Sequence, residues 1–323
     1  MLNNSDPTGQ PTPGDAPESP TSETAPSAPQ SSITPETRRR HPLEQSPQQP
    51  APPTNGSPQQ PSKRINLRIQ TVRPTLTYVL IAINVAIFML RMVSLEVDRT
   101  LVLWGANNPT AVFQNGEFYR LFTSMFLHAS VFDSNGQIVV TNTMHLLFNM
   151  LALYSIGAEV ERFFGHARFA VIYILGGLTG SVFSAILSDP QVLSIGASGA
   201  VFAVLGAEMV FLYRHRLLFG EVGRQRLQNT VVLLGINLVF GLLSAVSGSA
   251  MRIDNFAHLG GAVGGAVLTW FIGPSFNLRR HPEFPNELQT EDINPLRGRY
   301  GTVSLYFCAL LIALIVARLA LNR

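Results

Sequence analysis

Serine, histidine and asparagine side chains lie near the starts of three apolar segments, and together they could hydrolyse a peptide bond. Ser198 lies in Gly-Ala-Ser-Gly, and His258 lies in Ala-His-Leu-Gly-Gly. A serine hydroxyl is a weak nucleophile that needs a neighbouring base, and an imidazole can take its proton and return it to the leaving amine. We therefore predict a nucleophile at Ser198 and a general base at His258.

The tetrahedral intermediate of such a reaction carries an oxyanion, which needs hydrogen-bond donors already in position. His145 and Asn149 are four residues apart, so they share one face of a helix. The backbone N–H groups of Ala197 and Ser198 lie at a predicted helix start, where they have no partner within the helix. We predict that these groups form an oxyanion hole.

Each of these signals also has a plainer explanation. Gly-Ala-Ser-Gly is common helix-packing material, and a histidine or asparagine inside a membrane helix can simply join helices. Asp254 could orient His258 or only cap a helix start. His128 could support the site or be an ordinary loop residue. Polar groups inside membrane helices mark candidate functional sites. The catalytic interpretation depends on such groups, with complementary chemical roles, lying at the same depth in the membrane on three different helices.

The elements that must position these residues are membrane helices. The chain of 323 residues is 46% hydrophobic and only 13% charged, against about 25% charged in soluble proteins. Most apolar segments approach the roughly 20 residues that a helix needs to cross a bilayer, and a span must satisfy its own backbone hydrogen bonds. We predict seven helices, at about 75–92, 144–158, 169–187, 197–213, 230–246, 255–273 and 303–321.

Small residues allow the helices that carry Ser198 and His258 to meet, since they let backbones approach closely. The predicted packing positions near the site are Gly196, Gly199, Gly260, Gly261 and Gly264.

Basic residues are more numerous in the loops on the N-terminal side of the predicted membrane, which favours a cytoplasmic N-terminus and an outer C-terminus. Residues 1–62 hold most of the 22 prolines and few apolar residues, so we expect a disordered cytoplasmic tail. We expect a core at 63–275, a cytoplasmic linker at 276–302 and an extra helix at 303–323. The aromatic-rich stretch between the first two helices is either an element lying in the membrane interface or an ordinary outer loop.

These motifs resemble those of the rhomboid family. Gly196-Ala197-Ser198-Gly199 is similar to its Gly-x-Ser-Gly motif, and His258 lies in a segment similar to its Ala-His-x-x-Gly. His145 and Asn149 match its His-x-x-x-Asn, and the first loop has Tyr119-Arg120 and Leu127-His128. The resemblance covers about residues 73–275.

The resemblance implies an all-α, polytopic membrane bundle with a six-helix core plus a seventh, C-terminal transmembrane helix. It implies an intramembrane serine endopeptidase with a Ser198–His258 dyad, without metal or cofactor, that cleaves transmembrane proteins near the outer face through an acyl-enzyme. We expect a multi-pass protein of a bacterial plasma membrane. Two features depart from the family: about ten residues (Val131–Val140) are inserted before His145, and Phe202 stands where some members have tyrosine. The Phe202 ring can still pack on His258, but it cannot supply a hydroxyl bond.

Two rival functions remain. A non-catalytic rhomboid-like protein that binds or routes membrane clients would usually lack Ser198 or His258, and both are present. A small transporter would need polar residues at mid-membrane and an internal repeat. For the proposed protease, the expected partners are the lipid bilayer and transmembrane protein substrates. The small net charge of +3 does not suggest nucleic acid, and no His-Glu-x-x-His zinc motif occurs.

Overall fold

The computed structural model describes residues 66–133, 135–190, 192–246, 253–284 and 286–321. They belong to one compact unit formed within Ser62–Arg323. The tail expected over residues 1–62 lies outside the described residues.

All seven predicted apolar segments form helices. The first is α1 (Thr75–Arg91). The second consists of α5 (Thr143–Ala152), the π-helical turn η3 (Leu153–Gly157) and α6 (Ala158–Phe164). The others are α7 (His166–Leu187), α8 (Ser198–Arg214), α9 (Arg216–Val246), α10 (Asn255–Ile272) and α11 (Tyr300–Leu321). The predicted helix bundle is confirmed.

Four of the described helices are long and apolar enough to cross a membrane. They are α7, most of α9, α10, and α11 together with the turn before it, while α1 is a shorter apolar helix. The helix α9 has a kink at Gly220, whose φ of 54° and ψ of −136° are not helical. The expectation of six core helices plus one therefore remains a prediction as a count of membrane crossings.

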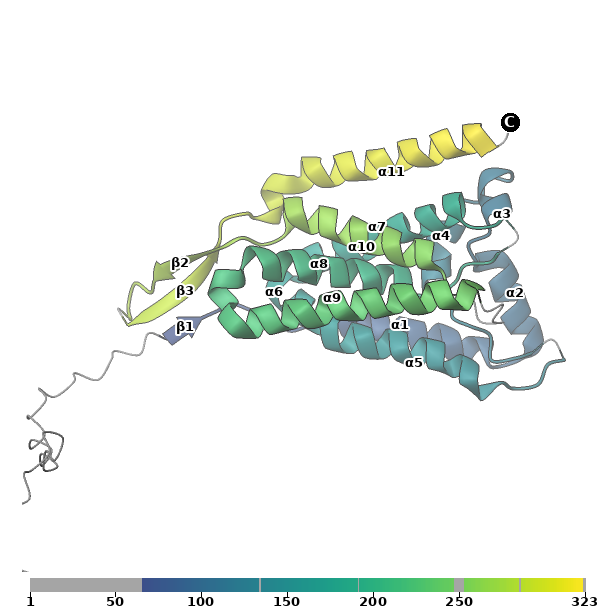
Figure 1. The fold of residues 1–323 in the computed structure, drawn as a ribbon, viewed down its shortest axis with the longest axis horizontal. Helices are drawn as coiled ribbons and strands as arrows, with labels where there is room; N and C mark the ends of the chain where they lie inside the picture. Colours follow the sequence, from purple (N-terminus) through teal and green to yellow (C-terminus); the bar gives the residue numbers. More distant parts are fainter. Residues whose placement is uncertain (1–65, 134, 191, 247–252, 285, 322–323) are drawn as a thin grey trace, which may run out of the picture. The chain divides into compact units, whose positions relative to one another are not determined.

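Helices α7, α8 and α10 form the centre of the bundle, and the other long helices lie around them (Figure 1). Glycine permits the close approach, because a Cβ on Gly265 would overlap the backbone of Ala203, and one on Gly206 would overlap that of Ala262. Large side chains fill the rest of the core; Phe169 is fully buried. Without a hydrophobic driving force in lipid, such backbone contact is a main source of helix association.

The start of α1 is capped by a side chain from another helix. Pro74 stands at the N-cap and makes no side-chain cap. The buried carboxylate of Glu161 accepts hydrogen bonds from the N–H groups of Leu76 (2.9 Å) and Thr77 (2.7 Å) and from the Thr77 hydroxyl (2.6 Å). This charge at a helix N-terminus satisfies donors that would otherwise have no partner.

A small sheet lies at one end of the bundle, and the sequence did not suggest it. Its strands are β1 (Asn66–Arg68), β2 (Phe276–Arg280) and β3 (Glu287–Asp292), in the order β1-β3-β2. The strand β3 pairs parallel to β1 and antiparallel to β2. The range expected as a linker thus contains a hairpin, followed by η4 (Leu296–Arg299).

The stretch between α1 and α5 is folded into short helices at the opposite end. They are α2 (Leu95–Gly105), α3 (Pro109–Phe113), α4 (Arg120–Thr123), η1 (Ser124–Phe126) and η2 (Val140–Asn142). The buried Arg120 donates to the carbonyls of Leu103 (2.7 Å) and Ala106 (3.1 Å) at the end of α2. It also binds Glu117 at 2.6 Å and thereby lowers the pKa of that carboxyl. Whether this helical element lies in the membrane interface stays a prediction.

Candidate functional site: a serine and two histidines at one end of the bundle

Main-chain hydrogen bonds to the first loop hold the turn before Ser198. Gly196 donates its N–H to the Ser124 carbonyl at 3.0 Å, and Ser194 exchanges two hydrogen bonds with Asn107 at 2.9 and 3.0 Å. Gly196 has a φ of +134°, which side chains with a Cβ rarely adopt. Ser198 then begins α8. Sequence reasoning missed Asn107 and Ser124, because they position the turn only through long-range contacts.

The ring of His145 and the hydroxyl of Ser198 border one small space above Gly196. A Cβ placed on Gly196 would lie 2.9 Å from His145 Cε1, 3.0 Å from its Nε2 and 3.5 Å from Ser198 Oγ. His145 Nδ1 accepts a hydrogen bond from the Ala129 N–H at 3.3 Å. In the neutral ring the proton is therefore on Nε2, so that Nε2 presents a donor to this space.

His258 reaches the site because α8 and α10 touch one residue beyond the serine. A Cβ on Gly261 would overlap the Gly199 carbonyl. The His258 ring stacks on Phe202, one turn along α8 from Ser198, with centroids 4.0 Å apart and planes at 9°. His258 is 7% exposed, whereas Ser198 is partly exposed. Phe202 thus fixes the plane of the imidazole against the helix that carries the hydroxyl.

Asp254 caps α10 and does not bind His258. Its carboxylate accepts from the Ala257 N–H at 2.9 Å and from the Ser184 hydroxyl at 2.5 Å. The Nδ1 of His258 is buried without a hydrogen-bond partner. Of the two roles left open by the sequence, the structure supports the cap. No hydrogen bond joins Ser198 to His258, both of which are described residues.

Asn149 lies in the second turn of α5, below His145. It is 7% exposed, and its Nδ2 donates to the His145 carbonyl at 2.7 Å. His128 is fully buried, and its ring lies edge-on to that of His145, with centroids 5.3 Å apart. The turn before His145 is anchored by Asn142, whose Nδ2 donates to the Ser130 carbonyl at 2.6 Å. The inserted stretch therefore folds back on the segment that follows His128.

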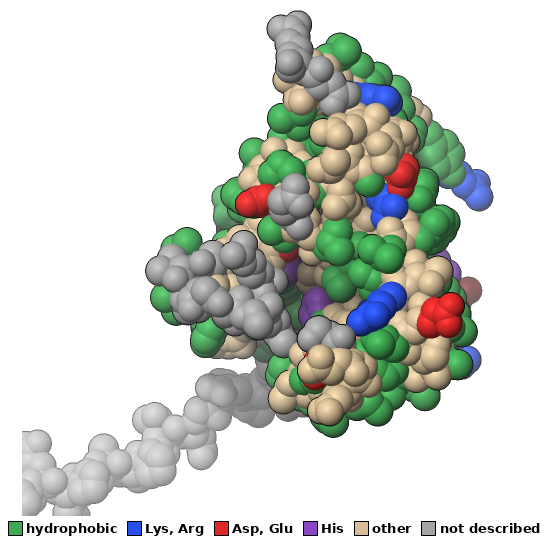
Figure 2. All heavy atoms as spheres, turned by 90° about the vertical axis from the view of Figure 1, so that its right-hand side faces the viewer, with side chains coloured by type: hydrophobic (Ala, Val, Ile, Leu, Met, Phe, Trp, Pro, Cys, Tyr) green, Lys and Arg blue, Asp and Glu red, His purple; other side chains and the backbone are tan. Residues whose placement is uncertain are grey.

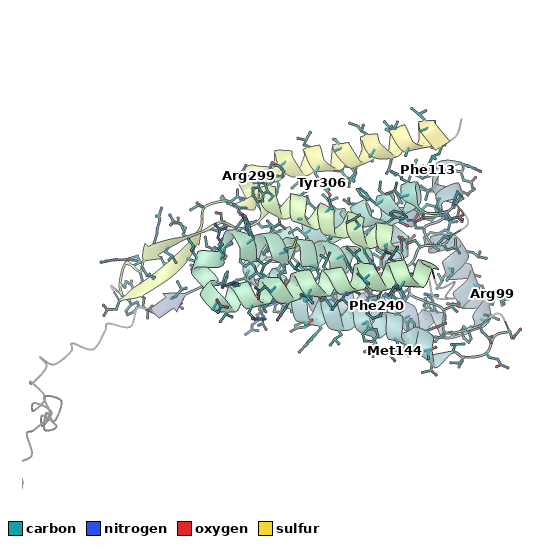
Figure 3. All side chains as sticks on the ribbon, in the orientation of Figure 1. Arg99, Phe113, Met144, Phe240, Arg299 and Tyr306 are labelled. Atoms are coloured by element: carbon teal, nitrogen blue, oxygen red, sulfur yellow. The ribbon has the colours of Figure 1, made fainter. Side chains whose placement is uncertain are left out.

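The glycines predicted to pack near the site face different neighbours. Gly261 faces α8, while a Cβ on Gly260 would meet Phe183 of α7. Gly264 lies against Thr179 and Tyr306, whose hydroxyls are 2.6 Å apart and join α7 to α11. Tyr306 points from α11 toward the bundle (Figure 3). The glycine stripe of α10 thus packs against three helices.

Figure 2 looks onto the end of the bundle that carries α2 and α3, and histidine side chains are visible there in a hollow. The catalytic candidates all lie in the first two turns of their helices: His145 and Asn149 in α5, Ser198 and Phe202 in α8, and His258 in α10. A site at helix ends, with a partly exposed serine, can be reached by water while its histidine remains buried.

The sequence is similar to those of known proteins. Residues 115–275 match the model of the rhomboid domain. The chain is 38% identical over 211 residues to Rhomboid protease GluP of Bacillus subtilis (strain 168), covering 63% of this chain and 36% of the relative. It is 29% identical over 222 residues to Rhomboid protease AarA of Providencia stuartii, covering 60% of this chain and 71% of the relative. It is 35% identical over 188 residues to RHOMBOID-like protein 1 of Arabidopsis thaliana, covering 57% of this chain and 43% of the relative.

The helix bundle, the apolar helices and the domain match define a multi-pass integral membrane protein. The chain belongs to the rhomboid family. It spans well under two thirds of the Bacillus and Arabidopsis relatives. Two of these relatives are named rhomboid proteases.

Proposed function

We propose that this protein is an intramembrane serine endopeptidase in which Ser198 is the nucleophile and His258 the general base. One observation carries the proposal: Ser198 Oγ and His145 Nε2 border the same space beside Gly196. A nucleophile next to a preorganised donor is the geometry that acyl transfer requires.

In the proposed reaction, His258 takes the proton of Ser198 as Oγ attacks the carbonyl carbon of the scissile peptide bond. The carbonyl π electrons move to oxygen, and the oxyanion accepts hydrogen bonds from His145 Nε2–H, Asn149 Nδ2–H and the backbone N–H groups of Ala197 and Ser198. Collapse breaks the C–N bond, and His258 gives the proton to the leaving amine. Water then attacks the acyl ester and releases Ser198.

A dyad without an acidic third member is consistent with the surroundings of His258. The candidate carboxylate, Asp254, is already bound by Ala257 and Ser184. Stacking on Phe202 replaces an acid as the means of orienting the ring. We expect the hydrogen bond between Ser198 and His258 to form with substrate bound, since catalytic hydrogen bonds often tighten only then.

The substrates we propose are transmembrane proteins, cut close to the outer face of a bacterial plasma membrane. The basic side chains Arg214, Arg216, Arg279 and Arg280 occupy the end of the bundle opposite the serine. Basic residues favour the cytoplasmic side. We therefore propose a cytoplasmic N-terminus, an outer C-terminus and a serine toward the outer face.

The decisive experiment is active-site labelling of the purified protein with a fluorophosphonate, which forms a covalent bond only with an activated serine. We expect one label per chain on Ser198 and cleavage of a model transmembrane substrate. Both should be lost in Ser198→Ala and in His258→Ala. A matched control is Ser155→Ala, because the Ser155 hydroxyl is exposed and bonded to the Leu151 carbonyl at 2.8 Å. Labelling at another serine, or full activity without Ser198, would refute the assignment.

A second candidate is a rhomboid-like protein that binds membrane clients without cleaving them. The observation that favours it is the missing hydrogen bond between the described residues Ser198 and His258. The same experiment separates the two functions. A properly folded wild-type protein that captures a transmembrane client, but neither takes up the label nor cleaves the client, would be a client-binding protein.

A further inference from the structure

A cavity of about 250 Å³ lies at the end of the bundle that carries the sheet, far along α8 and α10 from Ser198 and His258. It is formed where α8 and α10 end and where η4 leads into α11. Arg299, the last residue of η4, is labelled in Figure 3. Its charged lining residues are Arg214 and Arg299, and no Asp or Glu lines it. The proposed proteolysis uses none of these residues.

Both guanidinium groups are held in place by neutral acceptors. Arg299 donates its Nε–H to Asn294 Oδ1 at 2.6 Å, and the amide of Asn294 is itself fixed by the carbonyls of Phe271 (3.1 Å) and Gly273 (2.8 Å). Arg214 donates through Nη1 to the Trp270 carbonyl at 3.1 Å. Neither arginine forms an ion pair with any described residue. Their remaining N–H donors carry positive charge that no carboxylate among the described residues pairs with.

The carboxylate nearest in the chain to this lining is already bound. Asp292 pairs with the buried Arg168 at 2.7 Å and accepts from the N–H groups of Ser275 and Asn294, both at 3.0 Å. It forms no ion pair with Arg214 or Arg299. These two exposed guanidinium groups each bind a neutral acceptor and have no carboxylate partner among the described residues, so they are suited to a phosphate, which accepts several hydrogen bonds at once.

The rim of the cavity is apolar. Trp270 is 56% exposed and Ile293 is 58% exposed, and Phe271 adjoins them. Tryptophan at the end of a membrane helix is typical of the headgroup level of a bilayer. A ligand that matches both parts carries a phosphate for the arginines and a hydrocarbon chain for the rim. Basic pockets between membrane helices bind anionic lipid headgroups in this way.

We propose that this cavity binds the headgroup of an anionic phospholipid, with the phosphate between Arg214 and Arg299 and an acyl chain along Trp270 and Ile293. The bound lipid joins the ends of α8 and α10 to the start of α11. The proposal does not depend on proteolysis, because the site is at the opposite end of both helices.

Trp270 offers a direct test, because the chain has only two tryptophans. In a Trp104→Phe background, Trp270 is the sole tryptophan, and lipids brominated on their acyl chains quench it when they bind beside it. We expect phosphatidylglycerol to bind about 5- to 30-fold more tightly than phosphatidylcholine in vesicles, from about 1 kcal/mol for each arginine converted at 1.4 kcal/mol per tenfold. Arg214→Gln with Arg299→Gln should abolish this preference.

The matched control is Arg216→Gln with Arg280→Gln, which removes the same charge from exposed positions that do not line the cavity. This control should keep the preference for phosphatidylglycerol. Equal quenching by the two lipids in the parent protein, or loss of the preference in the control alone, would overturn the proposal. Competition by millimolar inorganic phosphate without any lipid preference would show a site for free phosphate and would overturn the lipid assignment.

Discussion

A glycine sets how closely the proposed nucleophile and one of its oxyanion donors can approach. At Gly196, a hydrogen takes the place of a side chain that would collide with the His145 ring, and the positive φ directs the chain into α8. The sequence motif Gly-Ala-Ser-Gly contains this glycine, but the motif alone does not say whether it serves helix packing or ring clearance. The structure indicates ring clearance, since the three atoms nearest to its Cβ position belong to the side chains of His145 and Ser198.

We expect Gly196→Ala to reduce proteolysis by about 100- to 1000-fold, the cost of one displaced oxyanion donor. The added methyl pushes the His145 ring away, and the left-handed backbone adds about 1 to 3 kcal/mol of strain. Gly165→Ala is the matched control, because Gly165 has a φ of +80° and no atom within 4 Å of its Cβ position. Both variants should lose similar stability in thermal unfolding, and only Gly196→Ala should lose the activity. If Gly196→Ala and Gly165→Ala were equally active, His145 would not be part of the proposed oxyanion hole.

Asn149→Ala should lower kcat by about 10- to 1000-fold and leave KM nearly unchanged, because an oxyanion donor acts in the transition state. Asn237→Ala is its control: that amide makes the same bond to the carbonyl four residues earlier, 2.8 Å to Leu233, at a partly exposed position of α9. Steady-state cleavage of a model substrate measures both. A loss in Asn149→Ala that appears only in KM would indicate substrate binding in place of oxyanion stabilisation.

At the scale of elements, hydropathy predicts the helices well, because each must satisfy its backbone and bury apolar side chains in lipid or protein. The segments at 75–92 and 255–273 agree with α1 and α10 to within a residue. The segment at 230–246 covers only part of α9, which begins at Arg216, because the residues that follow the kink at Gly220, up to Asn229, are mostly polar. Composition also cannot reveal that the second segment contains the π-helical turn η3.

The residues of the candidate site were also predictable from the sequence, but the neighbours that they contact were not. Residue type and spacing singled out Ser198, His258, His145 and Asn149, because polar groups in apolar helices are rare. Spacing does not show which neighbour each glycine faces, so the division of Gly260 and Gly261 between α7 and α8 emerged only from the fold. Pairings between distant segments, such as Asn107 with Ser194, have no local signal in the sequence.

The contact of α8 with α10 yields a further prediction. Gly261→Ala places a methyl group against the Gly199 carbonyl, so the helices must separate, and we expect a loss of about 1 to 3 kcal/mol from overpacking together with reduced cleavage. Gly235→Ala in α9 has open space at its Cβ position and should be neutral or stabilising by up to about 1 kcal/mol. Thermal unfolding in detergent compares them. If Gly261→Ala were as stable and active as Gly235→Ala, the close contact would not matter.

At the scale of the whole molecule, a buried arginine ties the sheet to the helices. Arg168, near the start of α7, is 8% exposed and binds both Asp292 of β3 and the Asn294 carbonyl. Because β3 also pairs with β1, this one side chain connects the beginning and the end of the described chain to the core of the bundle. A charge this deeply placed is costly unless both partners remain.

Arg168→Leu should therefore destabilise the protein by about 3 to 5 kcal/mol, since it leaves Asp292 without its cation. The control Arg279→Leu breaks an exposed pair with Glu291 on the same sheet and should cost less than about 1 kcal/mol. Chemical unfolding followed by circular dichroism measures both. Equal losses in the two variants would mean that the sheet contributes little to the stability of the bundle.

The parallel pairing of β1 with β3 also constrains the order of events during synthesis. The Gln70 N–H reaches Thr290, 220 residues later along the chain, and all described helices except η4 and α11 lie between them. At about 5 to 20 residues per second, the ribosome needs roughly 10 to 45 s to make that stretch. The first strand to emerge must therefore wait, unpaired, until α10 has been made, so closure of the sheet marks the moment at which the proposed catalytic helices are all in place.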